Sequence, residues 1–257
     1  MSFKDHFSSD SGGYARFRPG YPEGLFSWLA RIAPGREQAV DVACGSGQAT
    51  RFLGRHFSRV VGLDASAEQV DQCRPEPGLE YRVARAEETG LEPDSADLVT
   101  VAQALHWFDL DRFYPEAGRI LKPGGVLAAW TYERFETGDE AIDRIVDHFY
   151  RDLLGPYWPP ERVHVEAGYA DLPFPFREIS PPALEMKADW NLDQLIGYLG
   201  TWSAVARYRQ AGNPDPLPDL AARLRAHWPE SRPVVWPLRI RAGYNPGAPW
   251  AGSSPAA

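Results

Sequence analysis

The chain has 257 residues, of which 44% are hydrophobic and 24% charged, and its formal net charge is -8. This balance is that of a globular protein large enough to bury a core. The negative charge argues against nucleic-acid binding, which depends on a basic surface. No apolar run is long enough to span a membrane, and the first ten residues lack the apolar segment of a secretory signal. With only two cysteines, Cys44 and Cys73, we expect a protein of the reducing cytoplasm.

Short apolar runs alternate with helical segments between residues 38 and 132, a pattern typical of a parallel α/β sheet with helices on both faces. The strands predicted in this part cover residues 39–43, 58–63, 80–84, 96–102 and 126–132. The helices predicted between them cover residues 48–57, 67–74 and 110–121. Ser66 and Asp109 directly precede the second and third helices, where such residues act as N-caps.

Beyond residue 132 the pattern becomes mainly helical. Helices are predicted over residues 138–154, 192–210 and 217–228, with a strand inside 176–190 and a final strand at 234–242. We interpret the chain as one domain: an N-terminal lid (1–37), a core (38–132), a sheet completion with a helical cap (133–244), and a tail (245–257). The tail is rich in Pro, Gly, Ala and Ser and is predicted to fray.

A glycine-containing turn, D-V-A-C-G-S-G from Asp41 to Gly47, follows the first predicted strand. Glycine lets backbone approach a ligand without a clashing Cβ, and the next helix offers free N–H groups to an anion. Asp64 ends the second strand 17 residues after Gly47, where a carboxylate can accept hydrogen bonds from both hydroxyls of a ribose. NAD and S-adenosylmethionine both match these features. Thr50 stands where NAD-binding loops carry a third glycine, which disfavours NAD.

Four blocks between residues 40 and 130 resemble the class I S-adenosylmethionine-dependent methyltransferases. They are D-V-A-C-G-S-G, G-L-D, A-E-x-x-x-L-x-x-x-S-A-D-L-V and L-K-P-G-G-V-L. Two further blocks, Y-x-x-x-R-P-x-Y-P from Tyr14 and H-W-F-D from His106, resemble the small-molecule subgroup that includes trans-aconitate methyltransferases. A weaker likeness covers G-T-W-S-A at 200–204. The resemblance implies a Rossmann-like, doubly wound, mostly parallel sheet of seven strands with an N-terminal lid and a helical cap. It also implies S-adenosylmethionine as cofactor and a small-molecule methyl acceptor, such as a carboxylate.

The resemblance assigns cofactor contacts to individual residues. The residues expected beside the methionine part of the cofactor are Asp41, Ala43, Gly45 and Gly47, and Asp64 is expected to hold the ribose. The residues expected around the adenine are Ala65, Ala86 and Glu87. The residues expected beside the sulfonium are Ala102 and Gln103. Two positions depart from the family pattern. Ala43 replaces the first glycine of the loop, and Arg85 stands where an aspartate often contacts the adenine amine, which puts that contact in doubt.

His106 and Tyr14 are the candidate catalytic residues. The pKa of a histidine lies near neutrality, which suits removal of a proton from a hydroxyl or amine, but a histidine among aromatic residues is often only part of a pocket wall. Tyr14 either approaches the transferring methyl or lies in a surface arm. The candidate substrate-binding residues are Arg18, Tyr21, Trp107 and Trp202. No cluster with metal-ligand spacing occurs, so we expect no metal.

The acceptor decides whether a base is needed. An ionised carboxylate requires none, whereas an alcohol or amine does. A nucleic-acid base methyltransferase is the main alternative, but such enzymes usually carry D/N-P-P-Y/F after the fourth strand, where this chain has Q-A-L-H from Gln103. A catalytically silent cofactor-binding module is a further alternative. The sequence identifies neither the acceptor nor whether the protein is a monomer or a homodimer.

Overall fold

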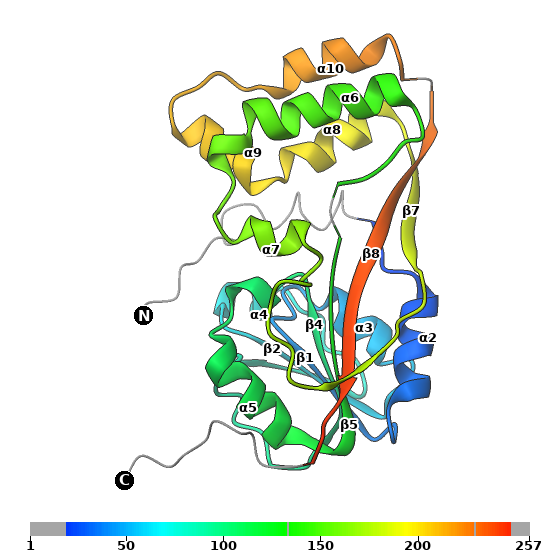
Figure 1. The fold of residues 1–257 in the computed structure, drawn as a ribbon, viewed down its shortest axis with the longest axis vertical. Helices are drawn as coiled ribbons and strands as arrows, with labels where there is room; N and C mark the ends of the chain where they lie inside the picture. The colour runs from blue at the N-terminus through cyan, green and yellow to red at the C-terminus, as the bar shows by residue number, and fades with distance from the viewer. Residues whose placement is uncertain (1–18, 133, 229, 248–257) are drawn as a thin grey trace. The chain divides into compact units, whose positions relative to one another are not determined.

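The computed structural model describes residues 19–132, 134–228 and 230–247 (Figure 1). The strands are β1 (Gln38–Val42), β2 (Arg59–Asp64), β3 (Leu79–Val83), β4 (Ala96–Ala102), β5 (Leu121–Tyr132), β6 (Arg177–Ile179), β7 (Glu185–Trp190) and β8 (Arg232–Tyr244). The helices are α2 (Glu23–Ile32), α3 (Gln48–Leu53), α4 (Ala67–Asp71), α5 (Leu110–Ile120), α6 (Glu140–His148), α7 (Arg162–Glu166), α8 (Leu192–Gly200), α9 (Ser203–Gln210) and α10 (Leu217–Arg225). Short 3₁₀ turns cover Leu105–Trp107 and Gly155–Tyr157, and a π turn covers Phe149–Leu153.

Contacts divide the chain into two compact units. The sheet unit comprises Tyr21–Thr131, His164–Leu184 and the chain from Arg239 onward. The helical unit includes Tyr132–Val163 and Glu185–Leu238. Three of the boundaries between the units fall inside β5, α7 and β8.

Seven strands form one continuous hydrogen-bonded path in the order β3-β2-β1-β4-β5-β8-β6. The pairs β1–β2, β1–β4, β2–β3 and β4–β5 are parallel, and β6 runs antiparallel to β8. Every residue of β1 is buried, because helices cover both faces of the sheet. Figure 1 shows α5 on one side and α2 and α3 on the other. The predicted doubly wound, mostly parallel sheet of seven strands is therefore confirmed. An eighth strand, β7, pairs antiparallel with the first half of β8.

The strand order reverses between β1 and β4, since β2 lies on one side of β1 and β4 on the other. At such a switch point the loops that follow the two strands diverge and leave a crevice at the carboxyl ends of the strands. The segment after β1 begins at Ala43, and the segment after β4 begins at Gln103. The fold therefore brings together, at one sheet edge, two segments that are far apart in the chain.

The helical unit packs α10 against α6 and α8. The prediction of one helix over residues 192–210 is wrong, because the chain turns between α8 and α9. Thr201 donates its hydroxyl to the carbonyl of Tyr198 at 2.7 Å, and Trp202 has an extended backbone (ψ 131°). The predicted helix over 138–154 likewise stops early, because α6 passes into the π turn at Phe149.

The structure also corrects the predicted N-cap at Asp109 and the predicted fraying of the tail. Ser66 caps α4 as expected, accepting from the N–H of Gln69 at 3.4 Å, but Asp109 makes no side-chain cap on α5. The prediction that the tail frays is wrong at its first residue, Asn245, and residues 248–257 of the tail lie outside the described residues. Asn245 is buried and donates its side-chain N–H groups to the carbonyls of Gly118 and Leu121 at 3.0 and 3.1 Å. Those bonds satisfy carbonyls at the end of α5.

Candidate functional site

The turn after β1 has a strained backbone. Ala43, Gly45 and Gly47 all adopt left-handed conformations, with φ of 56°, 53° and 76°. Glycine adopts this conformation freely, whereas alanine does so at a cost of about 1–2 kcal/mol. The turn is held in place by the N–H of Cys44, which donates to the carbonyl of Leu63 at the end of β2, at 2.9 Å. Ala43 therefore has the backbone geometry of a glycine although it carries a Cβ.

Asp64, at the end of β2, binds this turn directly. Its Oδ2 accepts from the N–H of Gly45 at 2.8 Å, and its Oδ1 accepts from the N–H of Ser66 at 2.9 Å. The side chain is only half-buried. An ionised carboxylate can accept about four hydrogen bonds in all. The geometry suits a carboxylate that orders the turn and also accepts from a ligand.

Asp41, near the end of β1, lies in the core beneath the turn. Its carboxylate accepts from the hydroxyls of Thr50 at 2.6 Å and Thr100 at 2.9 Å. Burial raises the pKa of Asp41 to about 6, although the two threonine hydrogen bonds act in the opposite direction. Asp41 thus connects β1 to α3 and β4.

Gln103 follows β4 at the same sheet edge. Its φ of 59° is left-handed, and its N–H donates to the carbonyl of Trp130 at 2.9 Å. Its Oε1 accepts from the hydroxyl of Thr131 at 2.9 Å, which fixes the orientation of the amide. The Nε2 is buried and has no hydrogen-bond partner among the described residues. A buried donor without a partner costs about 1–3 kcal/mol, so a ligand that accepts this hydrogen bond would relieve the penalty.

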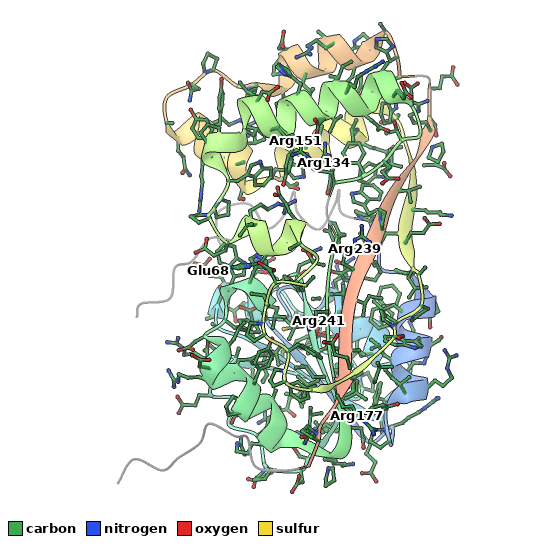
Figure 2. All side chains as sticks on the ribbon, in the orientation of Figure 1. Glu68, Arg134, Arg151, Arg177, Arg239 and Arg241 are labelled. Atoms are coloured by element: carbon green, nitrogen blue, oxygen red, sulfur yellow. The ribbon has the colours of Figure 1, made fainter. Side chains whose placement is uncertain are left out.

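His106 lies in the 3₁₀ turn after β4. Its Nδ1 is 3.0 Å from the hydroxyl of Tyr169, and its ring centroid is 4.6 Å from that of Trp107. Tyr169 is buried in the core of the sheet unit. Its carbonyl accepts from Arg241 at 2.8 Å, a residue of β8 labelled in Figure 2. The imidazole is therefore oriented by the phenol of Tyr169, a residue that is held by core packing and by the hydrogen bond from Arg241 to its backbone carbonyl.

Two sets of hydrogen bonds hold the segment after β3 to α5 and to the residue that precedes it. Glu87 accepts from the N–H of Asp109 at 3.1 Å, and its other oxygen is 3.4 Å from the Arg85 guanidinium. Ala86 is buried beside it. Arg85 therefore pairs with a neighbouring acid of its own segment.

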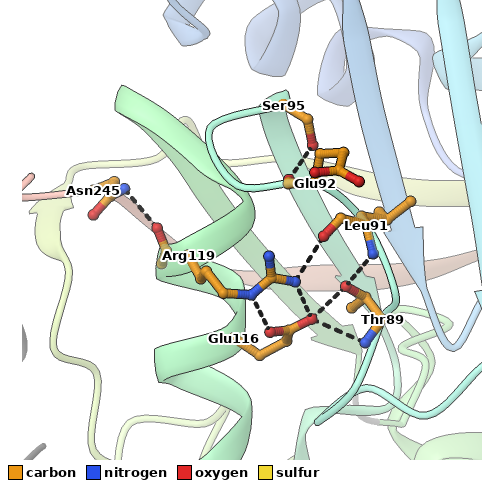
Figure 3. A network of polar contacts seen from close by, with 8 residues as sticks. Thr89, Leu91, Glu92, Ser95, Glu116, Arg119 and Asn245 are labelled. Carbon is orange, nitrogen blue, oxygen red and sulfur yellow. Dashed lines mark hydrogen bonds and ion pairs between the residues drawn. The ribbon is translucent and has the colours of Figure 1, made fainter.

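The second set of hydrogen bonds is the network in Figure 3. Thr89 donates its N–H to Glu116 at 2.9 Å and its hydroxyl to the same carboxylate. Arg119 holds that carboxylate at 2.7 Å and donates to the carbonyl of Leu91 at 2.8 Å. These bonds fix the segment that the family resemblance assigns to the adenine edge.

Tyr21 and Trp202, two further predicted residues, belong to different units. Tyr21 is buried in the sheet unit, edge-to-face with Trp130 at 5.5 Å between centroids. Trp202 is buried in the helical unit, 5.6 Å from Tyr150 and 5.5 Å from Trp158 between centroids. Tyr14 and Arg18 lie outside the described residues.

The described residues contain no group of three or more acidic, histidine and cysteine side chains arranged to hold a metal ion. Within the same residues, no helix has the length and apolar character needed to cross a membrane.

Comparison with known proteins identifies the family. Residues 40–129 match the model of a methyltransferase domain. A Dictyostelium discoideum protein assigned as a methyltransferase is 35% identical over 225 residues, which cover 86% of each chain. A solved structure from Anaeromyxobacter dehalogenans, assigned as a type II methyltransferase, is 50% identical with a TM-score of 0.83, and covers 89% of this chain and 98% of that one. A Saccharomyces cerevisiae protein assigned as an S-adenosylmethionine-dependent methyltransferase is 29% identical over 58% of this chain and 55% of its own.

The chain is a class I S-adenosylmethionine-dependent methyltransferase. The residues at the switch point of this methyltransferase fit the cofactor of the family. A Cβ on Gly47 would lie 2.7 Å from the hydroxyl of Tyr81, so this position requires glycine for space as well as for φ. Beside the turn, the half-buried carboxylate of Asp64 offers the acceptor that a ribose needs.

Sequence reasoning missed the residues of this methyltransferase that hold the predicted ones in place. They are Thr50 and Thr100 on Asp41, Thr131 on Gln103, and Tyr169 on His106. In the sequence, Thr50 stands out only as a residue at a position where NAD-binding loops carry glycine. Nothing in the local pattern around Tyr169 signals its role, because the contact is made across 63 residues.

Proposed function

We propose that this methyltransferase transfers a methyl group from S-adenosylmethionine to a small molecule that carries a carboxylate, as the resemblance to trans-aconitate methyltransferases implies. The observation that carries the proposal is the amide of Gln103. Its oxygen is occupied by Thr131 while its buried Nε2 has no partner among the described residues. A ligand that accepts a hydrogen bond at this position would complete the site, and carboxylate oxygens are strong acceptors.

The proposed cofactor site uses the turn after β1 and the ends of β2, β3 and β4. Asp64 accepts from the ribose hydroxyls, and Gln103 borders the sulfonium. The other proposed cofactor residues are Ala43, Gly45, Gly47, Ala65, Ala86, Glu87 and Ala102. Asp41 acts through the turn, because both of its oxygens accept from threonine hydroxyls.

The bound cofactor supplies a methyl group on a sulfonium, which is already an activated leaving group. Holding the acceptor in line with it therefore accounts for much of the rate. A carboxylate acceptor is already ionised and requires no base. The hydroxyl of Tyr169 lies 3.0 Å from Nδ1 of His106 and fixes its tautomer: a donating hydroxyl leaves the proton on Nε2, and an accepting hydroxyl leaves Nε2 unprotonated. With the proton on Nε2, His106 donates to a carboxylate acceptor; to act as a base toward an alcohol or amine it needs Nε2 unprotonated.

The acceptor side of the proposed site also uses Tyr14, Arg18, Tyr21, Trp107 and Trp202. The Arg18 guanidinium offers two parallel N–H donors, which match the two oxygens of a carboxylate. Tyr14 approaches the transferring methyl from the N-terminal lid, which excludes water when it closes. We also propose a cytoplasmic location, which the two free thiols of Cys44 and Cys73 support.

A panel of carboxylic acids, phenols and amines, incubated with methyl-labelled S-adenosylmethionine, tests this proposal. Mild alkali separates the products, because it releases labelled methanol from methyl esters and leaves ethers and methylamines intact. We expect alkali-labile label with the acids, and measurable turnover in His106→Ala. Label only on phenols or amines, lost in His106→Ala, would refute the carboxylate and make His106 the general base.

A further inference from the structure

Both cysteines of the chain lie at the turn that we propose for the cofactor. The sulfur of Cys44 is 3.6 Å from the carbonyl oxygen of Gly45, and the sulfur of Cys73 is 3.3 Å from the same oxygen. Both are free in this structure. Two thiols therefore meet at the residue whose N–H is held by Asp64.

The two thiols differ in access and in acidity. Cys73 is half-buried, whereas Cys44 is 8% exposed. The hydrogen bond from Cys44 and the positive charge of Arg51 lower the pKa of Cys73. The same hydrogen bond and burial raise the pKa of Cys44. Cys73 is thus the thiol that solvent reaches and that ionises first.

Cys73 lies in an irregular segment. Residues 73–76 belong to no helix or strand, and they connect α4 to β3. Both cysteines are nevertheless held by backbone hydrogen bonds: the N–H of Cys73 donates to the carbonyl of Val70 at 3.0 Å, and the N–H of Cys44 donates to that of Leu63 at 2.9 Å. Closing a bond between the two sulfurs therefore displaces the turn as well as the connecting segment, because a disulfide brings its sulfurs to about 2.05 Å.

We propose that Cys44 and Cys73 form a reversible disulfide, by exchange with a low-molecular-weight disulfide, and that this bond weakens cofactor binding. The Cys73 thiolate attacks one sulfur of the small disulfide, whose S–S bond breaks and releases one thiolate. The Cys44 thiolate then attacks the Cys73 sulfur of the mixed disulfide and releases the second thiolate. The two protons of the cysteines pass through solvent to the two released thiolates. Two cysteine thiols are oxidised, and one small disulfide is reduced to two thiols.

The effect on the cofactor follows from Gly45. A disulfide removes both thiol contacts with its carbonyl and pulls the turn toward the segment after α4. The N–H of Gly45 then leaves its place on Asp64, and that carboxylate is the proposed ribose acceptor. This inference rests on the cofactor site proposed above.

The test uses the full chain, oxidised glutathione as the small disulfide and S-adenosylhomocysteine as the probe ligand. Mass spectrometry of the digested protein detects a peptide pair joined through Cys44 and Cys73 with the loss of two hydrogen atoms. Calorimetry of the same sample measures affinity. We expect affinity to fall at least about tenfold on oxidation and to return with dithiothreitol. In the matched variant Cys73→Ser we expect parental affinity, unaffected by oxidised glutathione.

Affinity of the reduced protein reports on the cofactor site, and only the change on oxidation reports on the disulfide, so the two proposals fail separately. A glutathione adduct on Cys73 without a Cys44–Cys73 bond would overturn the inference. A complete Cys44–Cys73 bond with unchanged affinity would also overturn it.

Discussion

The hydroxyl of Tyr169 lies 3.0 Å from Nδ1 of His106, and these two residues are 63 positions apart in the chain. Tyr169 comes from the segment that precedes β6, and His106 from the turn that follows β4. A phenol in this position fixes the ring orientation and selects which nitrogen of the imidazole faces the site. Tyr169 is thus a positioning residue for the proposed acceptor contact.

Tyr169→Phe should lower kcat/KM for the acceptor about tenfold while S-adenosylhomocysteine affinity stays unchanged, because one orienting hydrogen bond is lost. Tyr114→Phe is a matched control. It removes another buried phenol of the same core, one that donates to the carbonyl of Pro173 at 2.6 Å. Steady-state kinetics should show no such loss in the control. In a His106→Ala background, Tyr169→Phe should have no further effect, and an additive loss would contradict the positioning role.

Asp64→Ala should weaken binding of S-adenosylhomocysteine by about 1.5–3 kcal/mol, since the variant loses acceptors for charged hydrogen bonds. The N–H of Gly45 also loses its partner, so the turn becomes less ordered. Isothermal titration calorimetry measures the change. Glu68→Ala removes an exposed acid only four residues away and is the control (Figure 2). Equal affinities in the two variants would show that Asp64 is not the ribose acceptor.

Asp41→Asn should stabilise the protein at neutral pH. Burial raises the folded-state pKa of Asp41 from 3.8 to about 6, so the ionised carboxylate destabilises the fold above pH 6. That penalty disappears as the pH falls from about 6 to about 4. The amide also finds partners, because Thr100 can turn its hydroxyl to the carbonyl of Val40, 3.4 Å away, and accept from the new amide. The gain in free energy of unfolding at pH 8 is at most about 3 kcal/mol.

Denaturant titrations of variant and parent from pH 4 to pH 8 measure this difference. It should grow with pH, and a difference that is constant or negative throughout would contradict the assignment. Asp97→Asn is the control, and it should change the free energy of unfolding at neutral pH in the opposite direction. Burial acts to raise the pKa of Asp97, but hydrogen bonds from the N–H groups of Gln38 and Glu37 and from Lys122 outweigh it and lower the pKa below 3.8. Its ionised form therefore stabilises the fold at neutral pH, and that contribution is lost only as the pH falls through the lowered pKa.

Deletion of residues 1–18 should leave a folded sheet unit that binds S-adenosylhomocysteine more weakly and transfers no methyl group, because the lid and Arg18 are removed. The deletion ends before Tyr21, since that ring packs on Trp130 in the core. Arg18→Ala alone should raise the KM of a carboxylate acceptor about tenfold or more. Arg16→Ala, two positions away, is the matched control. Full activity of the truncated chain would exclude a lid function.

The sequence alone predicted the features that depend on neighbours in the chain. Apolar runs marked the strands of the sheet, and the bounds predicted for the strand at 96–102 are those of β4. The motifs shared with the family located the methyltransferase core. The turn from Asp41 to Gly47 was predictable because its glycines allow backbone to approach a ligand without a clashing Cβ. Where a contact is local, as between Ser66 and Gln69, the residue type was enough to predict it.

Only the tertiary structure decided which side chains meet across the sheet. Asp41 and Thr100 are 59 positions apart, yet they lie on adjacent parallel strands whose order is set by crossover connections. The burial of Asn245 and the break before Trp202 likewise depend on what packs around them, and this overrides local composition. Cys44 and Cys73 appear in the sequence as two unrelated thiols. They become a pair because β2 and α4 return the chain to the carbonyl of Gly45.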